Sequence, residues 1–118
     1  MNIERGDVVL VQWPFSSGAG SKLRPALVVQ SDRNNRRIAN TIVAMITSTT
    51  YRSGEATQLI IDPASQEERG SGLRFASVVT CENVFTIRQH LISRKIGRLS
   101  ESAIDEIDTC LKVSLGLE

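Results

Sequence analysis

The sequence has few of the residue types from which metal sites, disulfide frameworks and acid–base pairs are usually built. Its 118 residues include two cysteines and one histidine. Cys81 and Cys110 follow no metal-ligand spacing, and so sparse a pair does not indicate a disulfide framework. His90 has no second histidine with which to form the acid–base pair of many ribonucleases. We therefore expect reduced thiols, a cytoplasmic location, no metal and a surface or half-buried histidine.

Long apolar runs and two common catalytic motifs are also absent. No apolar run approaches the length needed to span a membrane. Met1 leads directly into the charged stretch NIERGD, so we expect no signal peptide. There is no Gly-x-Ser-x-Gly nucleophile motif and no Gly-x4-Gly-Lys-Ser/Thr phosphate loop. With 41% hydrophobic residues, the chain is expected to form one domain, residues 1–118, with its own core.

The net charge of +1 conceals an uneven distribution of charge. Residues 101–118 have five acidic residues and one lysine, a balance of −4, whereas residues 1–100 have 13 basic and 8 acidic residues, a balance of +5. Eleven of the 14 basic residues are arginines. Arginine binds phosphate in a bidentate manner and stacks on flat rings. This excess suits a nucleic-acid partner, although charge alone also fits an ordinary solvated surface.

Short β-branched runs separated by polar turns predict a mainly β fold. We expect strands at residues 7–13, 24–32, 38–50, 56–62 and 74–87, the last as one strand or a pair, with Ile96 in a final short strand. The composition of residues 38–50 fits a strand or a helix, and the neighbouring strands favour a strand. A Gly-rich loop is expected at residues 14–22 and a polar turn at residues 33–37.

Only the C-terminal segment clearly predicts a helix. Ser100 is a good N-cap, with Leu99 and Ile104 placed as a hydrophobic staple, and Gly116 can end the helix. The apolar residues at helical spacing are Ile104, Ile107, Leu111 and Leu115. Several short strands followed by one helix predict a small antiparallel barrel with the helix packed at its side or end.

A permanent cation precedes the second expected strand. Pro25 forces Arg24 into an extended conformation and suits the first residue of a strand, so Arg24 is held where loop becomes sheet. Thr47 and Ser48 end another expected strand, and Glu82 lies within VVTCEN. Such a set could serve phosphoryl transfer: an arginine neutralises charge on phosphate oxygens, a hydroxyl holds an oxygen, and a carboxylate orients the arginine or accepts a proton. Taken singly, each residue also fits an ordinary structural role.

Five segments in a fixed order carry a family resemblance. GDVVLVQWPF, KLRPALVVQSD, TIVAMITS, VVTCENVFTI and KIGRLS follow one another along the chain. This order resembles MazF/PemK-type toxins, the toxin halves of bacterial type II toxin–antitoxin pairs. The resemblance covers essentially the whole chain, and its most specific pieces are the Gly-Asp and Arg-Pro starts of the first two strands together with ITS. It implies an SH3-like antiparallel β-barrel with a C-terminal α-helix, usually a homodimer.

The resemblance also implies an activity. Toxins of this family are sequence-specific, metal-independent endoribonucleases (mRNA interferases) that cleave single-stranded RNA. The ribose 2′-hydroxyl attacks the adjacent phosphate and leaves 2′,3′-cyclic phosphate and 5′-hydroxyl ends. Arg24 and Thr47 match the most recurrent catalytic residues, and Glu82 matches an acidic residue with a less uniform role. No cofactor is implied, and the expected partners are single-stranded RNA and a cognate antitoxin whose acidic tail folds across the RNA groove.

Further residues are expected to bind RNA, namely Phe15, Lys22, Ser48 and Asn83. The loop at 14–23 commonly gates the groove in this family. Phe15 and Trp13 could stack on unpaired bases, although a core position is preferred for Trp13, and Asn83 could read a base edge. Some relatives carry an arginine at the position of Thr80, so a mechanism that needs a second arginine there would not apply to this chain.

Two other functions stay open at this point. A CcdB-like gyrase poison shares the fold family but relies on an aromatic, Gly-rich C-terminus, which the ending KVSLGLE does not provide. A barrel that only binds RNA or protein is the second alternative. The joint presence of Arg24, Thr47 and Glu82 argues against it.

Overall fold

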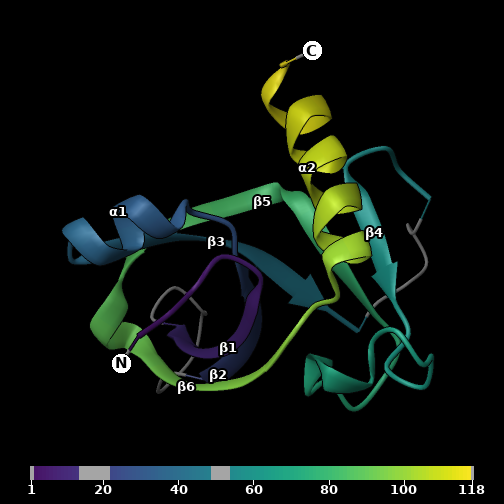
Figure 1. Cartoon of the computed structure of the whole chain (residues 1–118), viewed down its shortest axis with the longest axis horizontal. Coiled ribbons are helices and arrows are strands. Elements are labelled where there is room, and N and C mark those ends of the chain that lie inside the picture. Colours follow the sequence, from purple (N-terminus) through teal and green to yellow (C-terminus); the bar gives the residue numbers. More distant parts are fainter. Residues whose placement is uncertain (1, 14–21, 49–53, 118) are drawn as a thin grey trace.

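A curled antiparallel sheet with a helix against one end forms the body of the molecule (Figure 1). The computed structural model describes residues 2–13, 22–48 and 54–117. The strands are β1 (Asp7–Trp13), β2 (Lys22–Val28), β3 (Asn40–Thr47), β4 (Gln58–Ile61), β5 (Ser77–Arg88) and β6 (Ile92–Arg98). The helical segments are α1 (Asp32–Arg37), the 3₁₀ turns η1 (Arg69–Ser71) and η2 (Gln89–Leu91), and α2 (Glu101–Leu115). The expected mainly β class with a C-terminal helix is confirmed.

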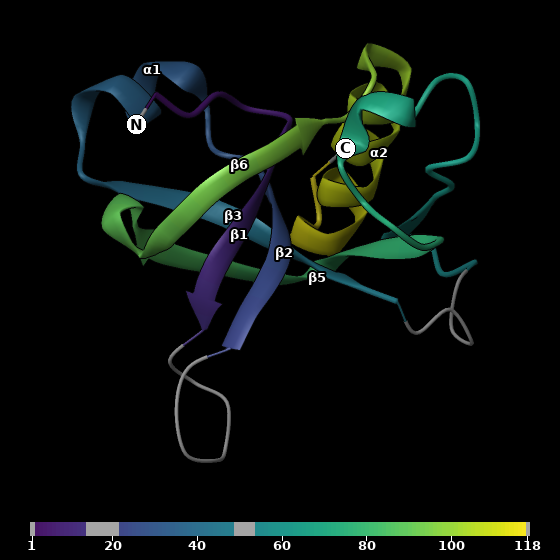
Figure 2. The ribbon, with the colours of Figure 1, turned by 90° about the horizontal axis from the view of Figure 1, so that it is seen from below.

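The strands pair in the order β4-β5-β3-β2-β1-β6, which places β4 and β6 at the two edges of the sheet. Figure 2 shows β1 and β2 side by side, with α2 lying near β5. Across the described residues, the sheet is therefore barrel-like but open between β4 and β6. None of the described helices is long and apolar enough to cross a membrane.

Alternating side chains of the central strands fill two cores on opposite faces of the sheet, because successive strand residues point to opposite faces. Val8 and Leu27 belong to the core shared with α2, whereas Val9 and Ala26 belong to the other. The central part of the predicted second strand is thus buried on both faces. Cys81 and Cys110 are free thiols, as expected, and the structure buries both in the core beneath α2.

The helix α2 begins and ends where the sequence predicts. The Ser100 hydroxyl accepts a hydrogen bond from the Ala103 N–H at 3.1 Å, which satisfies one of the donors left unpaired at a helix start. Gly116 adopts the left-handed conformation that commonly ends a helix.

Residues 33–37, predicted as a polar turn, lie in the helix α1, so that prediction is wrong. Ser31 caps this helix by accepting a hydrogen bond from the Asn34 N–H at 3.3 Å. Asn35 is buried, and its side-chain oxygen accepts hydrogen bonds from Gln30 at 2.9 Å and Thr41 at 2.7 Å. A polar segment becomes helical here because one of its amides is anchored to the sheet, a contact that local composition does not reveal.

The segment around η1 covers the edge of β6 that pairs with no other described strand. Gly72 has a φ of +77°, and a Cβ there would lie 2.1 Å from the carbonyl oxygen of Ile96. A Cβ at Gly97 would lie 2.3 Å from the carbonyl oxygen of Gly70. The buried carboxylate of Glu68 accepts hydrogen bonds from the Ser100 N–H and hydroxyl. These contacts fix the η1 segment against β6 and the start of α2, and they protect an otherwise unpaired edge.

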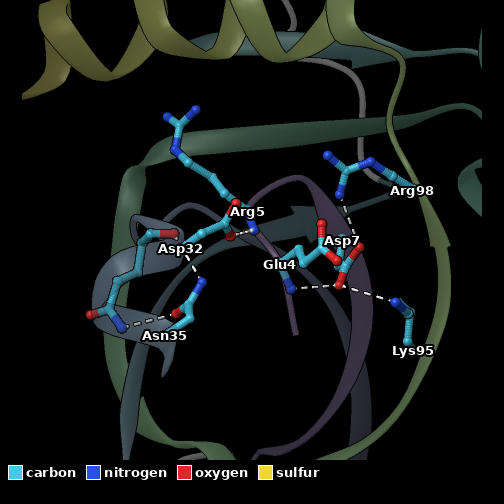
Figure 3. A network of polar contacts seen from close by, with 8 residues as sticks. Glu4, Arg5, Asp7, Asp32, Asn35, Lys95 and Arg98 are labelled. Atoms are coloured by element: carbon cyan, nitrogen blue, oxygen red, sulfur yellow. Dashed lines mark hydrogen bonds and ion pairs between the residues drawn. The ribbon is translucent and has the colours of Figure 1, made fainter. Parts of the chain in front are cut away.

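A second set of polar contacts fixes the start of the chain, and Figure 3 shows it from close by. The Asp7 carboxylate is 1% exposed and accepts a hydrogen bond from the Glu4 N–H at 2.7 Å. It also pairs with Arg98 at 3.1 Å and Lys95 at 3.4 Å. We call these four residues the Asp7 network. Because the carboxylate is buried yet surrounded by donors and cations, the network ties the start of β1 to β6.

Arg5 extends this link to both helices. Its N–H donates to Asp32 at 2.6 Å, and its guanidinium donates to the Val29 carbonyl at 2.8 Å. The same guanidinium forms an ion pair with Asp108 of α2 at 2.6 Å. A single arginine therefore joins Val29, the residue that follows β2, to α1 and α2.

Candidate functional site

A pocket of about 490 Å³ opens where the pairing of β2 with β3 stops. β2 pairs with β1 along its whole length, from Leu27 to Lys22, but pairs with β3 only from Ala26 to Val28. Pro25 lies directly at this change and has no N–H to offer a neighbouring strand. The first residues of β2 and the end of β3 consequently contribute to the lining of the pocket. The residues lining it are Leu10, Lys22, Leu23, Arg24, Pro25, Ile46, Thr47, Ser48, Gly72, Leu73, Arg74, Phe75, Ser77, Arg94 and Ile96.

The charged residues that line this pocket, among those the structure describes, are all of one sign. Four are basic and none is acidic; the four are Lys22, Arg24, Arg74 and Arg94. All four are exposed, and within the described parts of the chain none of them forms an ion pair or a side-chain hydrogen bond. Unpaired cations in a concave surface raise the local concentration of anions. The pocket is therefore suited to a polyanion such as the backbone of a nucleic acid.

Four of the residues expected from the sequence meet in this pocket. Lys22 and Arg24 come from the start of β2, and Thr47 and Ser48 come from the end of β3. Together they provide two cations and two hydroxyl groups. These are groups that can bind phosphate oxygens and stabilise charge that develops on them.

Glu82 and Asn83 do not line the pocket. They lie at an irregularity of β5, where the register changes between Ala44 and Met45 of β3. The Glu82 carboxylate accepts hydrogen bonds from Thr57 at 3.1 Å and Gln58 at 2.6 Å, at the start of β4. The structure thus holds Glu82 against β4 and not beside Arg24. Its catalytic role stays a prediction.

The remaining polar residues near this irregularity have structural contacts. Thr80 is buried and donates to the Met45 carbonyl at 2.9 Å, and Asn83 donates to Thr80 at 3.4 Å. Thr80 therefore helps to fix β5 on β3 at the position where some relatives carry arginine. His90 is exposed in η2 and is not part of the pocket, in agreement with the surface position expected for it.

Two expected residues fall outside what the structure describes. Phe15 and most of the loop at 14–23 lie outside the described residues, as does the side chain of Trp13. No group of His, Cys, Asp and Glu side chains in the described ranges could hold a metal ion.

Among the pocket residues that were not singled out from the sequence are two cations and an aromatic residue, namely Arg74, Arg94 and Phe75. Phe75 is 68% exposed, which is unusual for a large aromatic side chain. The signal was an arginine followed by an aromatic residue after the Gly-rich stretch RGSG. This pair was assigned to a strand starting at residue 74, whereas β5 begins at Ser77. Arg94 gave no signal, because β6 was expected only as a short strand around Ile96.

The two thiols offer no nucleophile for the pocket. Burial, together with the nearby Cys110 and Glu82, raises the pKa of the Cys81 thiol to about 12. Burial also raises the pKa of Cys110. Neither thiol lines the pocket, and both are protonated at neutral pH, so neither is placed to act there as a nucleophile.

Comparison with known proteins gives the family. Residues 4–115 match the model of PemK-like, MazF-like toxins of type II toxin–antitoxin systems. The chain belongs to this family. It is 31% identical to Endoribonuclease EndoA of Bacillus subtilis (strain 168), over 99% of this chain and 97% of that protein. It is 32% identical to Endoribonuclease MazF of Staphylococcus epidermidis, over 98% of this chain and 92% of that protein.

A solved structure confirms the fold of this PemK/MazF-family chain. An endoribonuclease from a mycobacterial species, in complex with its cognate antitoxin, superposes with a TM-score of 0.77. The two chains are 23% identical, and the similarity covers 98% of this chain and 97% of that one. The curled sheet with its C-terminal helix is thus the fold of this toxin family.

Proposed function

We propose that this PemK/MazF-family chain is the toxin of a type II toxin–antitoxin pair and acts as a sequence-specific, metal-independent endoribonuclease on single-stranded RNA. The observation that carries the proposal is that four cations, none with an acidic partner among the described residues, lie in one pocket with Thr47 and Ser48. The endoribonuclease relatives support the same activity.

In the proposed reaction, the nucleophile comes from the substrate. The 2′-oxygen of a ribose forms a bond to the adjacent phosphorus, and the bond from phosphorus to the 5′-oxygen of the next nucleotide breaks. The 2′-hydroxyl loses its proton to solvent, and the departing 5′-oxygen takes up a proton from solvent. The products carry a 2′,3′-cyclic phosphate and a 5′-hydroxyl. This reaction therefore needs neither a metal ion nor a nucleophile from the protein.

Arg24 and Thr47 have distinct roles in this proposal. Arg24 remains protonated at ordinary pH, so it stabilises the charge that develops on the phosphate oxygens and does not act as a base. Its position is fixed because β2 is paired with β1 on both sides of it, at Leu23 and Pro25. The Thr47 hydroxyl donates to a nonbridging oxygen. Glu82 has no step in this mechanism, because it is held against β4 outside the pocket.

Lys22 and Ser48 then bind the phosphates and sugars that flank the cut. The cognate antitoxin is proposed to cover the same pocket with an acidic, disordered segment that folds on binding, since the pocket offers unpaired cations to either polyanion. A homodimer and a cytoplasmic location complete the proposal, both in accordance with the family.

The test is cleavage of a long single-stranded RNA in EDTA, with the ends mapped by sequencing. Discrete cuts that leave cyclic phosphates are expected from the full chain, and their loss from Arg24→Ala. Arg33→Ala, which removes an exposed arginine of α1 outside the pocket, serves as the matched control and should cut normally. Absence of cuts on several diverse RNAs would contradict the proposal and favour a gyrase poison or a barrel that only binds RNA or protein.

A further inference from the structure

We infer that Arg74, Phe75 and Arg94 form a nucleotide-binding subsite, here called the Phe75 wall, that holds one unpaired nucleotide beside the cut. Phe75 stacks on an unpaired base beside the scissile bond, and the two arginines hold the neighbouring phosphates. The inference rests on the proposed RNA-cleaving function and deepens it. These residues belong to the pocket of Arg24 and Thr47 but come from different elements: the segment before β5 and the edge strand β6.

The strand pairing places the two sets within reach of one substrate. Leu10 of β1 lies opposite Pro25 on one side and opposite Arg94 on the other. Because neighbouring strands lie about 5 Å apart, the backbones of β2 and β6 are about 10 Å apart across β1 at this level. A short extended stretch of single-stranded RNA can span that distance and contact Arg24 and Arg94 together.

The wall is built on a fixed base. The segment that leads into Arg74 passes so close to β6 that Gly72 and Gly97 leave no room for a Cβ. On the other side of the wall, the Ser77 hydroxyl donates to the carbonyl oxygen of Phe75 at 2.8 Å. The backbone at Phe75 is thus held from both ends while its ring is 68% exposed. A held, exposed aromatic ring is ready to bind because little conformational freedom remains to be lost.

The chemistry of the wall matches unpaired RNA better than a protein partner. Bases splayed from single-stranded RNA stack on aromatic rings and on arginine guanidinium planes, whatever their sequence. Neither Arg74 nor Arg94 forms an ion pair within the described residues, and no acidic side chain lines the pocket. An aromatic ring and two such arginines in one pocket provide one stacking surface and two phosphate contacts.

The test combines protein variants with modified RNAs. For each combination, the dissociation constant Kd and the cleavage efficiency kcat/KM are measured. A short RNA that contains the mapped cut, or a short RNA selected for binding to the chain if no cut is found, is made with 2′-O-methyl groups, so that it binds without reacting. Further versions carry an abasic nucleotide at each flanking position in turn. The proteins are the full chain, Phe75→Ala, Phe75→Tyr and the control Ile38→Ala, which removes a 48% exposed side chain outside the pocket. Cleavage of the same RNAs without the methyl groups gives kcat/KM for each protein.

For Phe75→Ala, we expect Kd to rise roughly 5- to 100-fold on the intact RNA and kcat/KM to fall to match, because stacking of one base is worth that factor. The loss should vanish on the one abasic RNA that lacks the stacked base. Phe75→Tyr should restore binding, and Ile38→Ala should change nothing. Arg94→Ala should weaken all RNAs equally, abasic ones included, whereas Arg88→Ala on β5, outside the pocket, should not.

The outcomes separate this inference from the proposed function. Coupling between Phe75 and one base without any cleavage keeps the Phe75 wall and contradicts the endoribonuclease. Cleavage with equal losses on intact and abasic RNAs overturns the wall and leaves the endoribonuclease standing. Normal RNA binding by Phe75→Ala, with loss of binding to an acidic peptide, assigns the wall to a protein partner and also overturns it.

Discussion

Two groups of basic residues in this molecule have opposite surroundings. In the Asp7 network, Lys95 and Arg98 face a buried carboxylate at 3.4 and 3.1 Å. In the pocket, Lys22, Arg24, Arg74 and Arg94 form no ion pair with any acidic residue in the described parts of the chain. Lys95 directly follows Arg94 in β6, so one strand contributes to both groups. Because the cations of the first group pair with an acidic residue, they stabilise the fold. Because the cations of the second group have no such partner among the described residues, they are available to bind a ligand.

This difference matters because charge alone does not separate the two groups. Both consist of partly exposed cations, and both contribute to the positive balance of residues 1–100. The interaction partner of each cation determines whether it acts in stability or in binding. A cation that neutralises a buried carboxylate stabilises the native state, whereas unpaired cations repel one another and are tolerated at the surface of a binding site. The two groups should therefore respond to mutation in different ways.

The largest effect is expected from exchanging one member of each group for alanine. Arg24→Ala should lower kcat by about 100- to 1,000-fold, as loss of a transition-state donor does, with an unchanged melting temperature. Arg98→Ala should leave kcat unchanged and lower the free energy of unfolding by less than about 1 kcal/mol, because its side chain is 47% exposed. Single-turnover cleavage and thermal unfolding of both variants measure this. A large loss of kcat in Arg98→Ala would show that the paired cations also act in catalysis and would contradict the distinction between the two groups.

Next in size is the removal of the buried carboxylate itself. Asp7→Ala should lower the free energy of unfolding by about 2–3 kcal/mol, because the Glu4 N–H loses its acceptor and both cations lose their partner. The loss stays moderate since Lys95 and Arg98 can turn to water. Urea unfolding gives the value. Asp62→Ala, which removes an exposed carboxylate, is the control, and an equal loss there would show that burial of Asp7 is unimportant.

A smaller effect on stability is expected from a buried thiol, which belongs to neither group of basic residues. The folded chain raises the pKa of Cys81 from 9.0 to about 12, so the folded state keeps its proton where the unfolded state loses it. Stability should therefore fall as the pH rises from about 9 towards 12. Melting temperatures between pH 8 and 11 should fall more steeply for the full chain than for Cys81→Ala. Parallel slopes would mean that the thiol titrates normally in the folded state.

The smallest effect concerns Lys22, at the rim of the cationic group. Lys22→Ala should weaken RNA binding only a few-fold and reduce the slope of log Kd against log salt by about 0.7, the contribution of one phosphate contact to a single strand. Titrations of a labelled RNA at 50 to 300 mM salt measure the slope. Arg36→Ala on α1 should leave it unchanged. An unchanged slope for Lys22→Ala would remove this residue from the RNA path.

The sequence predicted the elements whose signals are local. The capped helix α2 and the β-branched strands follow from side-chain types at fixed spacing, and the structure has them. The helix α1 was missed because it depends on Asn35 contacting Gln30 and Thr41, which no local pattern encodes. The extent of β6 was missed because its polar, basic residues hide an edge strand.

The candidate site shows the same division. Arg24 and Thr47 could be named from the sequence because Pro25 and the strand ends mark them, and they do line one pocket. Glu82 carried the same kind of signal, yet a register change in β5 holds it against β4. Phe75 and Arg94 had no comparable signal, because their place in the pocket comes from η1 packing on β6.

The sequence by itself therefore determined the family, the β-rich class, the C-terminal helix and an arginine fixed at the start of a strand. These depend on residue types and short-range spacing. Only the tertiary structure decided which cations are paired and which are unpaired. That distinction depends on strands brought together from distant parts of the chain, such as Asp7 with Arg98 and Arg24 with Arg94. Spacing along the chain does not record such contacts.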